Sequence, residues 1–214
     1  RALAGALTAS GHASSLTASA AGVSGNLTSS VATTGDSTLS ADASASNTGE
    51  VQGRLQITAA GLIDSRGRVV GDATLTSTSG GEIVHAANVD GLLTTDTSGA
   101  TRLSGTLGSL AVVHSAALNF DNSTTINGTA AITASGAISQ STTAPLIVSG
   151  PLTISAPGQD VTLDHTANDF SSVQITAGKT VLTDQNTVTL DLNTGATTAR
   201  ALAGALTASG HASS

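Results

Sequence analysis

The chain has 214 residues with a formal net charge of −7, and more than half of them are Ala, Ser, Thr or Gly. It contains no Cys, Met, Trp or Tyr, two Phe, and seven Lys or Arg. This composition excludes a disulfide framework and thiolate chemistry, an aromatic platform for single-stranded nucleic acid, and a basic patch that would neutralise the phosphates of nucleic acids or anionic lipids.

The chain is nevertheless expected to fold. Leu, Ile, Val and Phe make up about 22% of the residues, just above the level of roughly 20% below which disorder is expected. The mean hydropathy is +0.20 and there are three Pro. With so few bulky side chains the core must be thin. No run of 18 apolar residues is present, so insertion into a membrane as a helix is not expected.

Short strands are predicted wherever aliphatic residues alternate with polar ones. A pattern of apolar, any, aliphatic, Thr or Ser, and a small residue recurs in residues 6–11, 55–63, 73–77, 130–138, 152–158 and 173–178. Alternation with a period of two and many β-branched residues indicate half-buried strands. Dipeptides such as Gly35-Asp36, Asp90-Gly91 and Asn127-Gly128 are typical of the turns between them.

The spacing of these strands predicts the architecture. Ile57 and Leu75 hold the central aliphatic position of consecutive copies of the pattern, and so do Ile132, Ile154 and Ile175. Their spacing is close to the period of roughly 20 residues that belongs to β-solenoids, whose turns are called rungs. We therefore expect an all-β parallel β-helix (β-solenoid) with rungs of about 20 residues. Because residues 1–50 hold seven Leu, Ile, Val or Phe and residues 151–200 hold twelve, the first quarter should be thinner, with Ala and Ser inside, or it should lean on a neighbour.

A literal duplication suggests the larger organisation. Residues 1–15 read RALAGALTASGHASS, and residues 200–214 repeat them exactly at an offset of 199. A cloning overlap would produce this, and so would an array of nearly identical units. On the second interpretation, residues 1–199 are one solenoid unit and residues 200–214 begin the next. The segment has alternating aliphatic residues and no Pro, so no flexible linker is expected. Self-association with identical units or neighbouring chains follows.

The C-terminal half resembles the repeats of filamentous-haemagglutinin-like bacterial surface proteins. Those repeats commonly carry an "AxNDF" turn, then "VxVTAG" and "LTDxN", which are similar here to residues 167–170, 173–178 and 182–186. The resemblance is good over residues 126–192 and weaker towards the N-terminus. It implies a right-handed parallel β-helix, secretion across an outer membrane, an extracellular or cell-surface location, and roles in adhesion or extracellular fibres. The lack of Cys fits secretion of an unfolded chain through an oxidising periplasm.

No catalytic, cofactor or metal site is predicted. The histidines do not form a metal-ligand motif, and each is expected on the surface or in a turn: His12, His85, His114, His165 and His211. Three acidic residues lie near His165 in sequence and would suit acid–base or metal chemistry, but solvated turns are the preferred interpretation: Asp160, Asp164 and Asp169. Phe170 is expected to pack onto the coil.

The expected function is non-enzymatic. One hypothesis is an extracellular fibre or stalk built by end-to-end stacking of units, and the alternative is the shaft of a cell-surface adhesin. Polysaccharide-cleaving β-helices need clustered carboxylates and aromatic platforms, which this chain scarcely supplies. Ice-binding solenoids need a Thr-x-Thr motif in nearly every rung, and two scattered instances occur. Three sequons at Asn26, Asn122 and Asn127 make glycan decoration a further candidate.

Overall fold

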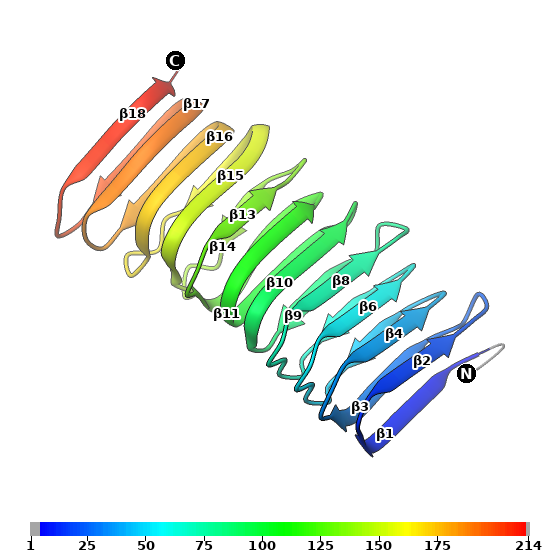
Figure 1. Cartoon of the computed structure of the whole chain (residues 1–214). Helices are drawn as coiled ribbons and strands as arrows, with labels where there is room; N and C mark the ends of the chain where they lie inside the picture. The colour runs from blue at the N-terminus through cyan, green and yellow to red at the C-terminus, as the bar shows by residue number, and fades with distance from the viewer. Residues whose placement is uncertain (1–4, 213–214) are drawn as a thin grey trace.

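The structure, a computed structural model, describes residues 5–212, which form one coil of parallel β-strands (Figure 1). The coil has about 11 turns, about 19 residues apart, and these residues contain no helix. This confirms the expected β-solenoid. The strands are β1 (Leu7–Ala13), β2 (Leu16–Ala20), β3 (Leu27–Thr33), β4 (Ser37–Ala41), β5 (Ala45–Asn47), β6 (Leu55–Ala59), β7 (Ile63–Ser65), β8 (Ala73–Ser77), β9 (Ile83–Ala86), β10 (Val89–Thr97), β11 (Ala100–His114), β12 (Ala117–Ile126), β13 (Ala130–Thr133), β14 (Ile138–Gln140), β15 (Leu146–Leu163), β16 (Asp169–Asp184), β17 (Val188–Ala201) and β18 (Leu206–Ala212).

Two sheets form the broad sides of the coil. We call the row β2, β4, β6, β8, β10, β11, β13, β15, β16, β17 and β18 the front sheet. The row β1, β3, β5, β7, β9, β11, β12, β14, β15, β16 and β17 is the rear sheet. The long strands β11, β15, β16 and β17 bend at a corner and contribute to both. Front strands run one way and rear strands return behind them as the chain advances, so the coil is right-handed (Figure 1).

A third, narrow side closes each rung between the rear and front sheets. It consists of one column of paired residues, which are almost all aliphatic: Thr33, Val51, Val69, Val89, Leu107, Ile126, Val148 and Phe170. Each member lies directly above the previous one, at the spacing of about 4.8 Å between hydrogen-bonded strands. Because every rung donates to and accepts from its neighbours along the axis, the backbone is satisfied without a wide core.

The core is a set of stacked aliphatic ladders. Along the front sheet, Leu39, Ile57 and Leu75 are successive partners and are completely buried. Ile132, Ile154 and Ile175 continue the same kind of stack and are at most 2% exposed. Successive side chains of a strand point to opposite sides, so the inward positions are those the two-residue alternation identified. Burial of each such side chain contributes about 1.5–3 kcal/mol.

The first quarter has small residues at several inward positions, as expected. Its front sheet places Ala18, Ala20 and Ala41 inside, and its rear sheet places Ser29 and Ala45 inside. Small side chains fill less of the space between the sheets, so these rungs bury less apolar surface per residue than later ones.

The coil passes through residue 200 without interruption. Strand β17 runs from Val188 to Ala201 and pairs along its length with β16, while β18 pairs with the first half of β17. The second copy of the duplicated segment therefore begins inside a strand. No linker separates the segment from the preceding rungs.

No helix long and apolar enough to cross a membrane is found in residues 5–212.

Candidate functional site

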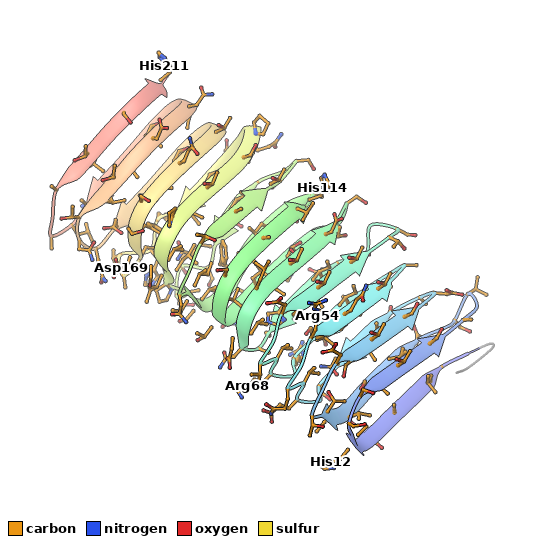
Figure 2. All side chains as sticks on the ribbon, viewed as in Figure 1. His12, Arg54, Arg68, His114, Asp169 and His211 are labelled. Carbon is orange, nitrogen blue, oxygen red and sulfur yellow. The ribbon has the colours of Figure 1, made fainter. Side chains whose placement is uncertain are left out.

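A groove of about 670 Å³ lies at the corner where the front strands end. Five successive rungs contribute to it, through the C-terminal ends of β8, β10, β11 and β13 and through β15. Nine of its thirteen lining residues carry hydroxyl groups, and Asp96 and His114 are its ionisable members. His114 is labelled at this end of the front strands in Figure 2.

A β-bulge brings the two ionisable residues together. Thr95 of β10 is opposite Val112 of β11, but the next residue, Asp96, is opposite His114, so Val113 is the extra residue. A bulge re-aims the side chains that follow it. Val113 is left 41% exposed, and His114 Nδ1 lies 3.0 Å from Asp96 Oδ1. The two residues are one rung apart in space.

Buried hydroxyls hold the floor of the groove. Ser77 Oγ donates to the carbonyl of Gly61 at 3.0 Å, and Thr97 Oγ1 donates to that of Gly81 at 2.7 Å. Ser115 Oγ lies 3.4 Å from the carbonyl of Gly99 and donates to that of Ala117 at 2.6 Å. In all three rungs the hydroxyl reaches the carbonyl of a glycine on the preceding rung. These side chains satisfy backbone groups of the corner and are not free for a ligand.

The exposed hydroxyls are the ones a ligand can reach. Thr78, Ser98, Thr133 and Ser135 are exposed around the groove. Hydroxyl groups donate and accept hydrogen bonds, and the Asp96 carboxylate accepts them. A ring nitrogen of His114 donates or accepts according to whether it carries a proton. The arrangement suits a polar, polyhydroxylated molecule held by hydrogen bonds. An aromatic stacking surface is absent from the described lining.

The acidic residues near His165 do not converge on a ligand site. Asp160 and Asp164 are exposed. Asp169 accepts hydrogen bonds from Gln185 Nε2 at 3.2 Å and Asn186 Nδ2 at 3.0 Å on the next rung. Among residues 5–212, no group of three or more His, Asp or Glu side chains could hold a metal ion. Asp160 and Asp164 face solvent, and Asp169 links its corner to the next rung.

His85 corrects the expectation that every histidine lies on the surface or in a turn. It faces inward from β9, is 1% exposed, and stacks between Ser65 and Leu103. In the described part of the chain neither ring nitrogen has a partner with hydrogen-bond geometry. Loss of solvation lowers the pKa of His85 to about 4, and the nearby Ala87 backbone offsets part of that shift. The imidazole is therefore neutral at pH 7.

The remaining histidines agree better with the expectation. His12 and His211 are exposed on strands. His165 is half-buried in a corner, where its Nδ1 accepts from the Ala167 N–H at 3.0 Å. His114 is exposed and paired with Asp96.

Two arginines bridge carboxylates across three rungs. Arg68 lies 3.3 Å from Glu50 on the rung before and 2.6 Å from Asp90 on the rung after. Arg102 lies 2.6 Å from Glu82 and 3.1 Å from Asp121 in the same manner, and these contacts raise the pKa of its guanidinium, Glu82 first. These side chains are exposed or half-exposed, so each bridge contributes little to stability. Their charges are compensated rather than offered to an anionic partner.

The outward Thr positions of the front sheet form an incomplete ladder. Thr17 and Thr38 are partners, and Thr74 and Thr94 are partners two rungs further on. Gln56 interrupts the column between them, and Ala111 and Ala131 occupy it after Thr94. A flat ice-binding ladder would need the hydroxyl on nearly every rung.

The three sequons differ in accessibility. Asn122 is exposed within β12, and Asn127 is exposed directly after that strand. Asn26 is exposed, but its Oδ1 accepts from the Ser44 N–H at 3.2 Å. In the Asn122 sequon, Thr124 is buried and its hydroxyl donates to the Asn122 carbonyl.

His114 is recognisable in the sequence as a candidate, but no local pattern pairs it with Asp96. The signal that was available is the rung spacing, because residues about one rung apart on the same sheet become neighbours. Searching for Asp or Glu one rung before or after each histidine would have found Asp96. The bulge at Val113, which makes the pairing possible, has no clear signature in the sequence.

The comparisons with known proteins are sparse. A family described as "Repeats of unknown function (DUF5649)" matches residues 107–177. Those residues include His114 and most of β11 to β16. No curated protein and no solved structure matches the chain.

Proposed function

We propose that the chain is a non-enzymatic structural repeat of a large secreted bacterial surface protein, whose β-solenoid units stack end to end as an extracellular fibre or stalk. The observation that carries the proposal is the passage of the coil through residue 200 into a second copy of its own first residues. Because the coil enters the next unit within a strand, its rungs stack across the junction without a hinge. A stiff rod is the expected product.

Self-association is part of the same proposal. The partner proposed is an identical unit or a neighbouring chain. With a net charge of −7 and with Arg68 and Arg102 paired to carboxylates, nucleic acid is not a proposed partner.

The filamentous-haemagglutinin-like identity is part of this proposal. The residues that carry the resemblance have structural roles here. Asn168 and Phe170 are buried in one corner, and Asp184 accepts the Phe170 N–H at 2.8 Å. A location outside the cell, on a bacterial surface, follows from the resemblance.

Electron microscopy of a tandem chain tests the fibre. A unit of 199 residues at about 19 per rung and about 4.8 Å per rung should lengthen the rod by about 50 Å. Rods that grow by this increment per unit support the proposal. Flexible beads, or a rise well above about 60 Å per unit, would contradict a continuous coil.

A single unit of residues 1–199 gives a second test. Its unpaired end rungs should make it associate at tens of micromolar, which sedimentation velocity would detect. A stable monomer at that concentration would argue for closed domains on a string.

The groove favours a second candidate, the shaft of an adhesin. Exposed hydroxyls beside Asp96 and His114 would hydrogen-bond surface glycans, and an array would present many copies. Adhesion of a tandem chain to glycan-coated beads, lost in Asp96→Ala and retained in the matched variant Asp191→Ala, would favour the adhesin. Equal adhesion by both variants would leave the fibre as the function.

A further inference from the structure

The two copies of the duplicated segment lie on opposite sides of the coil. In the first copy, β1 belongs to the rear sheet, with Leu7 next to Leu27. In the second copy, β18 belongs to the front sheet, with Leu206 next to Val188 and Ala208 next to Leu190. Figure 1 shows β1 running in the opposite direction from β18. Identical sequences thus enter the coil at different phases.

The number of residues per turn explains the difference. The rear-sheet column that starts at Leu7 passes through ten pairings and arrives at Thr197. The copy of Leu7 is Leu206, nine residues beyond Thr197. Nine residues are about half of a 19-residue turn. The 199-residue unit therefore contains about ten and a half turns.

The strand within the segment keeps its local structure in both places. The strands cover equivalent residues, Leu7–Ala13 and Leu206–Ala212. The equivalent glycines Gly11 and Gly210 have nearly the same backbone angle, φ of 115° and 108°, in the region that favours glycine.

Its inward residues also fit either side. Ala9 stacks on buried Ser29 in the rear sheet, and its copy Ala208 stacks on buried Leu190 in the front sheet. A methyl group meets either neighbour without overlap, whereas a Leu or Phe at this position would fit one side better than the other. The duplicated segment is thus suited to enter the coil at two phases.

From this we infer that consecutive units join with a half-turn offset, so that equivalent strands alternate between the front and rear sheets and two units form the structural repeat of the rod. The inference rests on the proposed end-to-end array. The rungs of the next copy of the unit would continue the coil from β18. The groove at Asp96 and His114 would then be displayed on alternating sides of the rod.

Disulfide trapping in a tandem two-unit chain tests the phase, because the natural sequence has no Cys. Thr189 and Thr207 are exposed neighbours on β17 and β18, at the backbone separation that a disulfide spans. With the half-turn offset, Thr189→Cys with Thr207→Cys should form a disulfide in most molecules. An in-phase junction would instead require the copy of Thr8 to displace Thr198 from its place above Val181 in the rear sheet, so Val181→Cys with Thr207→Cys is the competing pair.

The control pair is Thr8→Cys with Thr28→Cys, neighbours on β1 and β3. Cross-linking of Val181 with Thr207 would overturn the inference, as would a result in which only the control pair forms. The readout does not depend on fibres. If no rods form but Thr189 and Thr207 still cross-link, the proposed fibre fails while the offset at the junction stands.

Labelling supplies an independent readout in chains that do form rods. A gold label on Ser98→Cys, at the groove, should appear on alternating sides of the rod, about 100 Å apart on any one side. Labels on one side only, about 50 Å apart, would show in-phase units and overturn the inference.

Discussion

Gln140 and Asn168 join two rungs through both of their amide groups. Gln140 Nε2 donates to Asn168 Oδ1 at 2.6 Å, and Asn168 Nδ2 donates to Gln140 Oε1 at 3.0 Å. Asn168 Oδ1 also accepts the Leu146 N–H at 2.8 Å, and its Nδ2 donates to the Leu163 carbonyl at 3.1 Å. Asn168 is completely buried. The Asn168 side chain thus provides hydrogen-bond partners for two backbone groups of this corner, the Leu146 N–H and the Leu163 carbonyl.

Asn168→Ala should lower the free energy of unfolding by about 2–4 kcal/mol, because it leaves several buried polar groups without partners. Denaturant unfolding monitored by circular dichroism measures the loss. The matched control is Asn186→Ala, whose side chain is exposed and bonds to Asp169; its effect should stay below about 0.5 kcal/mol. Equal effects of the two variants would show that the Gln140–Asn168 pair is not what holds the corner.

Phe170→Ala should destabilise the coil by about 3–5 kcal/mol. The ring is completely buried and stacks on Val148 in the third-side column, so its removal opens a cavity. Phe170→Leu keeps most of the volume and should cost less than half as much. A loss below about 1 kcal/mol for Phe170→Ala would mean that the ring is exposed and available to a ligand.

Acid should weaken the coil through His85. Its pKa in the folded chain is about 4, below the ordinary value of 6.5, so the unfolded chain binds the proton first. Stability from this residue is complete above about pH 6.5 and declines as the pH falls towards 4. The total loss is about 3 kcal/mol.

The test compares unfolding free energies of the natural chain and His85→Leu between pH 7 and pH 4. Leucine suits the site because Leu103 occupies the same column on the next rung. The difference between the two proteins should grow with acidity. A constant difference between the natural chain and His85→Leu at all pH values would contradict the burial of a neutral imidazole.

Thr97→Val should cost about 1–3 kcal/mol, because it replaces a hydroxyl with a methyl group of the same shape and leaves the Gly81 carbonyl unpaired. The hydroxyl also accepts the Gly99 N–H at 2.9 Å, so two turns loosen together. Thr94→Val, an outward position of the same strand, is the matched control and should be nearly neutral. If both substitutions are neutral, the corner hydroxyls do not stabilise the rungs.

Much of the fold could be read from the sequence because its signals are local. A period of two assigns Leu55, Ile57 and Ala59 to the inside of a strand, and the recurrence of the same pattern at the length of one solenoid turn indicates stacked rungs. The small residues inside the first quarter followed from counting the aliphatic residues, since residue size at inward positions sets how much a rung can bury. The burial of Phe170 followed from the turn expected at residues 168–170.

Contacts between rungs depend on lengths that vary along the chain. In the rear sheet, the step from Ile138 to its partner Val161 is longer than the step from Thr180 to its partner Thr197. A difference of one residue in a turn moves a side chain from inside to outside or changes its neighbour. The register between distant rungs depends on the sum of all the turn lengths, and no local sequence pattern contains that sum. The burial of His85, the pairing of Asp96 with His114 and the side on which each copy of the duplicated segment lies were therefore decided by the tertiary structure, through the accumulated register of the coil.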